Sequence, residues 1–244
     1  MDAVIVIPAR WGASRFPGKA LARIGDDTLI GHVIRRAKDC RRAAAVWIAT
    51  DDERIAAEAE RHAVGAVLPP GDFASGTDRI AAALDEIETR AGIRYSQVIN
   101  VQGDEPLLDV GAVDAMIGML QQSGVDLATL CCPIRGPEEH LDPNVVKVVL
   151  DAASNALYFS RAPIPAGSWQ QARRHVGIYG YQTPVLRAFA AIAPTPLERA
   201  ERLEQLRALE NGFTIRVVET SAPHLGVDSP EDVRKIEQEL ARLR

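Results

Sequence analysis

Three cations and two glycines lie in the short segment that follows the first apolar run of the chain. The cations are Arg10, Arg15 and Lys19, and Gly12 and Gly18 lie among them. Arginine side chains and a mobile ammonium bind phosphate oxygens, while glycines let the backbone approach a ligand closely. The segment therefore predicts a polyphosphate site, although it matches neither a Walker-type loop nor a dinucleotide fingerprint. A solvated loop with chance arginines is the alternative, because 24 of the 28 basic residues are arginine.

A second polar segment follows the apolar run at residues 97–101. Gln102 and Asp104 lie two residues apart, so they share one face of an extended chain, and Gly103 leaves room for a ligand between them. A carboxylate at this position is a natural Mg²⁺ ligand beside a nucleotide phosphate. A turn in which Asp104 caps a helix started by Pro106 is the alternative.

A third acidic candidate, Asp228, lies close to the C-terminus. It could complete a metal site with Asp104. However, Ser229 is a suitable N-cap, Pro230 suits a first helical turn, and acidic residues follow it. From the residues alone, a role for Asp228 in the cap is the preferred interpretation.

The remaining polar clusters have a functional and a structural interpretation each. Residues 75–79 open a predicted helix, whose N-terminal amides could bind a base edge or an anion, or could simply be capped. His175 and Tyr179 fall on one face of a predicted strand. One face of a predicted helix carries Glu201, Glu204 and Gln205. An ordinary charged surface would show the same spacing. The other histidines have no zinc-like spacing, and we assign them to the surface or to packing.

Alternating strands and helices in the first half of the chain must position these residues. Strands are predicted at 4–7, 45–49, 66–68, 97–101 and 126–130, and helices at 29–41, 52–62, 77–90 and 110–121. Continuous apolar strands separated by helices form a parallel sheet that is covered on both faces. Ligands bind at the carboxyl ends of such strands, so the polar segments after residues 7, 49 and 101 are expected at one edge.

The pattern changes after about residue 132. Residues 144–161 predict two short strands around a turn at 152–155, and residues 175–182 predict another strand, so an antiparallel lobe is expected. One helix is predicted from Pro196 to the Asn211-Gly212 pair, and a last helix begins at Ser229.

Composition excludes several classes of protein. The 244 residues carry a net charge of −5, with 47% hydrophobic and 25% charged residues, which is typical of a globular chain and not of collagen, coiled coils or disorder. The acidic balance argues against general nucleic-acid binding. The three cysteines form no paired framework, and the apolar run near the N-terminus is too short for a signal peptide or a membrane span. We therefore expect a cytoplasmic protein with reduced thiols that binds neither nucleic acid nor membrane.

Nine segments of the chain together resemble the cytidylyltransferases that activate 3-deoxy-manno-octulosonate (KDO) for bacterial lipopolysaccharide. In chain order they are IPARWGASRFPGK, ATDDERI, SGTDRIA, NVQGDEP, NVVKVVLD, ALYFSRAPIP, RHVGIYGYQ, PLERAERLEQLR and GVDSPEDV. The resemblance implies a nucleotide-diphospho-sugar transferase-like three-layer α/β fold, with a mixed, mostly parallel sheet and a smaller antiparallel lobe. It implies a single domain, 1–244, with a nucleotide-binding part at about 1–132, a sugar-binding and dimerisation lobe at about 133–212 and a C-terminal return at 213–244.

The resemblance also implies a homodimer that uses Mg²⁺ and assigns roles to the polar residues. The catalytic groups would be Arg10, Lys19, Asp104 and Asp228, and the two aspartates would hold the metal, in place of the capping role for Asp228. CTP would contact Pro8, Ala9, Arg10, Arg15, Lys19, Ser75, Gly76, Thr77, Arg79 and Gln102. The acidic sugar would contact Gln102, Arg161, His175, Tyr179, Glu201, Glu204 and Gln205. An arginine and a histidine suit its carboxylate, and the acids and amide suit its hydroxyls.

The implied reaction is attack of the sugar 2-hydroxyl on the α-phosphorus of CTP, which would give CMP-KDO and pyrophosphate. Two other functions stay open. A related cytidylyltransferase could act on another acidic sugar, such as an amino-substituted octulosonate or a sialic-type acid. The chain could also be an inert nucleotide-binding module, which would bind CTP without turnover of any sugar acid.

Overall fold

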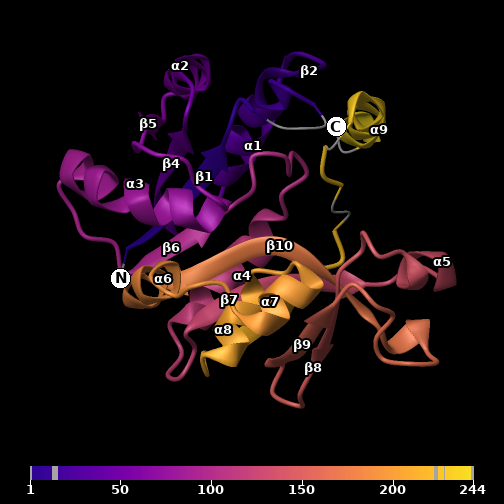
Figure 1. Cartoon of the computed structure of the whole chain (residues 1–244). Coiled ribbons are helices and arrows are strands. Elements are labelled where there is room, and N and C mark those ends of the chain that lie inside the picture. The colour runs from indigo at the N-terminus through magenta and orange to yellow at the C-terminus, as the bar shows by residue number, and fades with distance from the viewer. Residues whose placement is uncertain (1, 13–15, 223–224, 228, 243–244) are drawn as a thin grey trace. The chain divides into compact units, whose positions relative to one another are not determined.

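The computed structural model describes residues 2–12, 16–222, 225–227 and 229–242. Contacts divide the chain into two compact units (Figure 1). Unit 1 is formed by Met1–Asp114 and Pro223–Arg244, and unit 2 by Ala115–Ala222. The predicted boundaries near residues 132 and 212 separate parts by function, whereas these units are separated by contacts. The functional boundaries therefore stay a prediction.

Unit 1 is built on four parallel strands. They are β1 (Ala3–Ala9), β4 (Ala43–Thr50), β5 (Gly65–Val67) and β6 (Gln97–Asn100), in the spatial order β6-β1-β4-β5. Its main helices are α1 (Leu29–Lys38), α2 (Glu53–Arg61), α3 (Gly76–Ala91) and α9 (Pro230–Arg242). Shorter elements are the 3-10 turn η1 (Lys19–Leu21) and the paired strands β2 (Arg23–Ile24) and β3 (Asp27–Thr28). Helix α4 (Val110–Leu120) begins in this unit and continues into unit 2.

The sequence pattern explains why β1 is an interior strand of this unit. All seven of its residues are buried, as expected for a continuous apolar strand between two neighbours. Pairing of Ala9 with Thr50, and of Val6 with Asn100, brings the carboxyl ends of three strands to one edge, as predicted. Helix α3 then begins beside that edge, because the Ser75 hydroxyl accepts the Asp78 N–H as an N-cap at 3.1 Å.

Unit 2 contains the predicted antiparallel strands. They are β7 (Leu127–Pro133), β8 (Lys147–Leu150), β9 (Ala156–Ser160) and β10 (Arg173–Gln182), and β11 (Ile215–Glu219) adds a parallel partner for β7. The spatial order is β11-β7-β10-β8-β9. Its helical elements are α5 (Pro137–Leu141), η2 (Trp169–Gln171), α6 (Thr183–Ala190), α7 (Pro196–Glu201) and α8 (Gln205–Glu210). Figure 1 shows α7 and α8 side by side, next to the β8–β9 hairpin.

One predicted helix is wrong, because the segment from Pro196 to Gly212 forms two helices. The chain turns at Arg202, whose φ of 56° and ψ of 47° are left-handed, and the Leu203 N–H bonds back to the Glu198 carbonyl at 3.2 Å. This is a helix C-terminus without the glycine that usually marks one. The amphipathic pattern continues across the break, so periodicity alone could not locate it.

The C-terminal helix α9 packs close to the segment that carries Lys19. Ile236 of this helix is buried in one apolar cluster with Ile24, Leu29, Leu107 and Val227. Figure 1 shows α9 (yellow) beside β2 (indigo), and the Gly25 N–H donates to Glu237 of α9 at 3.1 Å. Residues from the two ends of the chain therefore form one part of unit 1.

Crossing a membrane would need a longer, more apolar helix than any in the described part of the chain.

Candidate active site

A cleft of about 260 Å³ lies in unit 1 at the carboxyl edge of the parallel strands. The predicted nucleotide residues that line it are Pro8, Ala9, Arg10, Lys19, Ser75, Gly76, Arg79 and Gln102. Asp104 lines it as well, with the apolar side chains of Phe16 and Phe73. The predicted residues Arg15 and Asp228 lie outside the described residues. Concavity, cations and a carboxylate together fit a polar ligand of nucleotide size.

Lys19 and Asp104 form the charged centre of this cleft. The Lys19 Nζ lies 2.5 Å from Asp104 Oδ2 and donates to the Val227 carbonyl at 3.0 Å. The Val227 N–H in turn donates to the Asp104 carbonyl at 3.2 Å. Two oxygen atoms from distant parts of the chain thus hold one cationic group at the cleft.

Two glycines let the backbone fold closely around this centre. Gly18 has φ of 72°, and a Cβ there would lie 2.8 Å from the Trp11 ring. A Cβ on Gly103 would lie 3.1 Å from the Pro8 carbonyl oxygen. Side chains would therefore strain the loop before Lys19 and crowd the approach of the Asp104 loop to β1.

The alternative in which Asp104 caps a helix is wrong. Residues 103–104 and 106–107 form turns, and the next helix, α4, begins only at Val110. The Ala112 N–H in that helix is accepted by Asp109 at 3.1 Å. The Asp104 carboxylate is therefore not needed for a helix end, and it faces Lys19 instead.

One wall of the cleft holds an arginine with a donor that makes no hydrogen bond within the described part of the chain. Arg79 is 6% exposed, pairs with Asp51 at 3.1 Å and lies over the Phe73 ring. Its Nη1 is buried and has no hydrogen-bond partner among the described residues. A buried donor of this kind is costly unless a ligand or water satisfies it.

A chain of amides orients Gln102 at the same edge. The Gln102 Nε2 donates to Asn100 Oδ1 at 3.2 Å, and the Asn100 Nδ2 lies 3.4 Å from the Thr77 hydroxyl. Thr77, a predicted nucleotide contact, is buried below the cleft and does not line it. We therefore interpret Thr77 as support for Gln102.

In unit 2, two of the predicted sugar contacts, Arg161 and Glu201, are joined by hydrogen bonds. The Glu201 carboxylate accepts the Ser160 hydroxyl at 2.6 Å and the Arg161 N–H at 2.9 Å, while the Arg161 Nε donates to the Glu201 carbonyl at 2.9 Å. Lys147, which is fully buried, donates to the Arg161 carbonyl at 2.7 Å. No role was predicted for Lys147, because nothing in a strand pattern signals a buried ammonium.

His175 and Tyr179 of β10 also lie together. Their ring centroids are 5.4 Å apart, and the Phe159 ring packs on His175 at 5.0 Å. Burial, with a smaller effect from the Arg174 charge, lowers the pKa of His175 to about 3. Burial also raises the pKa of Tyr179, together with the nearby Tyr181 and Glu204. Both side chains are therefore uncharged at neutral pH.

Strand β9 links these two groups of predicted sugar contacts, because Phe159 contacts His175 and the adjacent Ser160 contacts Glu201. Gln205 is 5% exposed, and its Nε2 is buried without a hydrogen-bond partner among the described residues. Like Arg79 in unit 1, Gln205 offers a donor that a polar ligand would satisfy.

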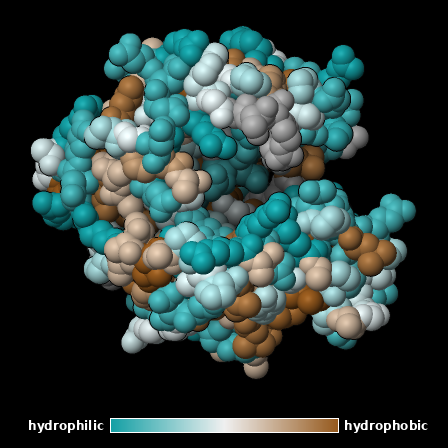
Figure 2. All heavy atoms as spheres, in the orientation of Figure 1, coloured by the Kyte–Doolittle hydropathy of each residue, from teal (hydrophilic) through white to brown (hydrophobic). Residues whose placement is uncertain are grey.

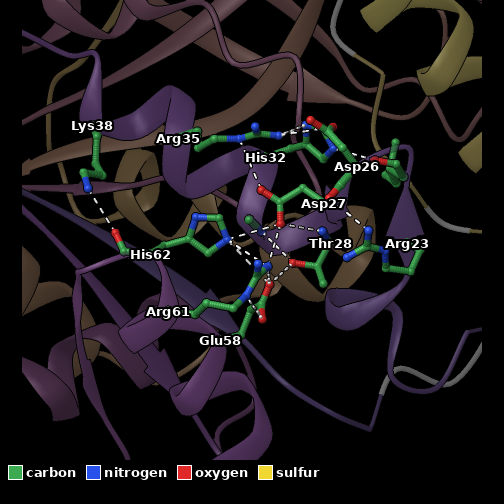
Figure 3. Close-up of polar contacts among 12 residues, drawn as sticks. Arg23, Asp26, Asp27, Thr28, His32, Arg35, Lys38, Glu58, Arg61 and His62 are labelled. Atoms are coloured by element: carbon green, nitrogen blue, oxygen red, sulfur yellow. Dashed lines mark hydrogen bonds and ion pairs between the residues drawn. The ribbon is translucent and has the colours of Figure 1, made fainter.

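A separate polar cluster in unit 1 combines Asp27, Glu58 and His62, whose ligand-type atoms lie within 4.8 Å of one another (Figure 3). Arg61 donates to Asp27 at 2.8 Å and to Glu58 at 2.5 Å, and Arg35 lies 3.2 Å from Asp27. Burial alone would raise the pKa of Asp27, but the Thr28 N–H, Arg61, His62 and Arg35 lower it below the usual value. Guanidinium groups already balance these charges, so the cluster is a structural ion-pair network.

Comparison with known proteins decides the family. A family model described as "Cytidylyltransferase" matches residues 4–218. A 3-deoxy-manno-octulosonate cytidylyltransferase of Anaeromyxobacter sp. (strain K) is 47% identical over 97% of both chains, and one of Geobacter metallireducens is 43% identical over the full length of both. The chain belongs to the 3-deoxy-manno-octulosonate cytidylyltransferase family.

Solved structures of similar fold support the same family. The structure of a CMP:2-keto-3-deoxy-manno-octonic acid synthetase complexed with CTP has a TM-score of 0.91 and 37% identity, and the match covers both chains fully. A Bacillus anthracis structure described as a putative glucose-1-phosphate thymidylyltransferase has a TM-score of 0.69 at 16% identity, over 98% of this chain and 95% of that one, and supports the fold alone. The predicted fold, a nucleotidyltransferase-type α/β fold with a mixed sheet, is confirmed for this family member.

Proposed function

We propose that this chain transfers CMP from CTP to 3-deoxy-manno-octulosonate, releases pyrophosphate and so serves lipopolysaccharide biosynthesis. The observation that carries the proposal is the cleft in unit 1, where Lys19 and Asp104 meet beside Arg10, Arg79 and Gln102. The family and the CTP-bound relative support the same activity. An inert module is disfavoured, because the described cations and the Asp104 carboxylate stand together at the cleft.

The residues of unit 1 support distinct steps of this reaction. Lys19 and Arg10 neutralise the triphosphate, and Lys19 stabilises the charge that develops as the bond to pyrophosphate breaks. Arg79 and Gln102 offer oriented hydrogen-bonding groups to the cytosine edge. Because a base with the wrong donor pattern would leave buried polar groups unpaired, this arrangement favours cytosine over uracil.

The donor set of the cleft fits a magnesium ion. Asp104 Oδ2 and the Val227 carbonyl already hold the ammonium of Lys19, and hard oxygen ligands beside phosphates are those that Mg²⁺ prefers. Asp104 would hold the ion, and Asp228 is proposed as the second ligand. When bound, Mg²⁺ supplies charge neutralisation on the triphosphate.

The sugar is proposed to bind through the polar residues of unit 2. Arg161, which Glu201 and Lys147 hold in place, carries the charge that a sugar carboxylate needs. His175, Tyr179 and Gln205 are buried or half-buried polar groups that suit hydroxyls. The reaction itself needs the 2-hydroxyl oxygen to attack the α-phosphorus in line with the departing pyrophosphate, and positioning contributes most to such a step.

A homodimer is proposed as the working form. Unit 2 exposes large apolar side chains on β9 and α7, where Leu157 is 60% and Leu197 39% exposed. Figure 2 shows brown side chains gathered in the lower part of the view, in the region where Figure 1 places β8, β9 and α7. Such a patch on a protein surface is typical of an interface.

The experiment is a pyrophosphate-release assay with CTP, Mg²⁺ and KDO, in which the wild type and Asp104→Ala are compared. We expect the wild type to turn over KDO and Asp104→Ala to be inactive with an unchanged fold, because the metal and Lys19 lose their shared carboxylate. Glu60→Gln, which changes an exposed acid of α2, is the matched control and should stay fully active.

Other substrates separate the alternatives. UTP should be a poor substrate, and an amino-substituted octulosonate or a sialic-type acid should react more slowly than KDO. Near-normal activity of Asp104→Ala in Mg²⁺ would remove Asp104 from the site. Binding of CTP by the wild type without turnover of any sugar acid would contradict the enzymatic proposal.

A further inference from the structure

Thr129 lies on β7, directly behind the buried histidine of β10. The Thr129 side chain is fully buried, and its Oγ1 lies 2.9 Å from His175 Nε2. The same oxygen lies 2.8 Å from the Ile178 carbonyl oxygen and 3.3 Å from the Val176 carbonyl oxygen. No role for this threonine follows from the residue pattern or from the family resemblance.

A bulge in β10 creates this arrangement. Val176 pairs with Leu130, but Tyr179 already pairs with Thr129, so two extra residues of β10 are accommodated between these pairs. The bulge brings two carbonyl groups of β10 to one hydroxyl of β7. His175 and Tyr179 flank the bulge, and their rings remain close, with centroids 5.4 Å apart.

The single hydrogen of the Thr129 hydroxyl fixes the direction of its hydrogen bonds. A threonine hydroxyl has one hydrogen to donate, and a carbonyl oxygen can only accept. The hydroxyl therefore donates to Ile178, at the shorter distance, and accepts from His175. The imidazole hydrogen must then lie on Nε2, and in a neutral ring this makes Nδ1 an acceptor.

The surroundings of the ring keep it neutral, and the Thr129 contact is made by Nε2 and not by Nδ1. Phe159 packs edge-on against the imidazole, and burial strongly lowers the pKa of His175. Among the described residues, the ring's hydrogen-bond partner is Thr129. A neutral acceptor attracts a hydroxyl and repels a carboxylate, whose oxygens are themselves acceptors.

We propose that Thr129 is a positioning residue that holds His175 with its hydrogen on Nε2, so that Nδ1 accepts a hydrogen bond from a hydroxyl of the acidic sugar. This proposal rests on the proposed function and revises one expectation, because His175 then serves a hydroxyl and Arg161 alone serves the carboxylate. Thr129 thus contributes to sugar recognition without touching the sugar.

The first test measures the tautomer of His175 and does not depend on enzymatic activity. Long-range proton–nitrogen NMR spectra of the ¹⁵N-labelled enzyme should show His175 with a protonated Nε2 and an unprotonated Nδ1 at pH 7. The spectrum of His175→Asn identifies the signals. A hydrogen on Nδ1, or a charged ring, would overturn the proposal even if the enzyme is fully active.

The second test separates sugar binding from the other steps. Thr129→Val keeps the shape but removes the hydroxyl, and we expect the KM for KDO to rise by about ten-fold, the scale of one lost hydrogen bond, with kcat and the KM for CTP nearly unchanged. Thr129→Ser restores the hydroxyl and should restore the KM. Thr220→Val, which removes another buried hydroxyl of unit 2, is the matched control.

The outcomes distinguish this proposal from the proposed function. An unchanged KM for KDO in Thr129→Val, or a Thr129→Ser enzyme as impaired as Thr129→Val, would overturn the role of Thr129. If Thr129→Val does not fold, the KM of Thr129→Ser for KDO and the NMR spectrum of the wild-type histidine test the role of Thr129 instead. If the wild type does not turn over KDO, the proposed function fails, and the NMR spectrum still decides whether Thr129 fixes the histidine.

Discussion

The chain has only four lysines among its 28 basic residues. Two of them, Lys147 and Lys19, differ from each other in their surroundings. Lys147 is fully buried and donates to three carbonyls, those of Asp142, Val145 and Arg161, at 2.6–2.9 Å. Lys19 instead binds one carboxylate and one carbonyl at the cleft. A compact ammonium with three donors fits both places, whereas a planar guanidinium is larger and has a fixed geometry.

Replacement of Lys19 by alanine should act on catalysis. Because the ammonium is proposed to stabilise the charge that develops on the triphosphate, kcat/KM should fall by about 10² to 10³-fold, or about 2.7 to 4 kcal/mol of transition-state stabilisation. Steady-state kinetics with CTP and KDO measure this change. Lys38→Ala, which removes an exposed lysine of α1, is the control and should leave kcat/KM nearly unchanged. A loss confined to the KM for CTP would show that Lys19 only binds the substrate.

At the scale of elements, an ion-pair network joins the β2–β3 hairpin to helices α1 and α2 (Figure 3). Arg61 of α2 contacts Asp27 of β3, and Arg35 of α1 contacts the same carboxylate. The network can approach α1 closely because residue 31 is glycine. A Cβ there would lie 2.4 Å from Asp27 Oδ1 and 2.6 Å from His62 Nε2.

Gly31→Ala should therefore destabilise the protein, although alanine is the better helix former. Steric displacement of the network should cost about 1 to 3 kcal/mol, against a gain of at most about 1 kcal/mol in helix propensity. Urea unfolding measures the difference. The control is Gly111→Ala in α4, where the nearest atom, Asp109 Oδ1, lies 3.4 Å away, and this variant should be neutral or slightly more stable. A Gly31→Ala protein more stable than the wild type would contradict the explanation that a Cβ at residue 31 displaces the ion-pair network.

At the scale of the whole molecule, the buried histidine makes stability depend on pH. The pKa of His175 is about 3 in the folded protein, against an ordinary value of 6.5. Between these values the unfolded chain binds the proton and the folded protein does not, so stability rises with pH across this window and is lost as the pH falls. Above about pH 6.5 the histidine contributes no further change.

The free energy of unfolding should fall by about 2 kcal/mol from this histidine between pH 7.5 and 5. Urea unfolding at the two pH values measures the loss, and His175→Asn should show a smaller loss. An NMR titration of the His175 ring provides the control on the folded state, because its signals should not move between pH 8 and 5. A titration midpoint above pH 5 would contradict the neutral, buried ring.

The strand and helix positions of the first half were largely predictable, because each strand is a short apolar run and each helix has a clear cap or period. The cleft was predictable too, since parallel strands bring their carboxyl ends to one edge. Strand β11 was not predicted, because residues 215–219 alternate polar and apolar side chains only weakly and are defined by pairing with β7. The break at Arg202 was also missed, as no glycine or proline marks it.

The family and most elements followed from the amino-acid sequence alone, because they depend on residue types at short spacing, and the phosphate and metal roles drawn from the same spacing stay predictions. The tertiary structure decided which distant groups meet. Lys19 reaches the Val227 carbonyl across 208 positions of sequence, and Thr129 reaches His175 across 46. It also decided that His175 is neutral, since burial and hydrogen-bond direction are properties of the packed protein and not of any segment.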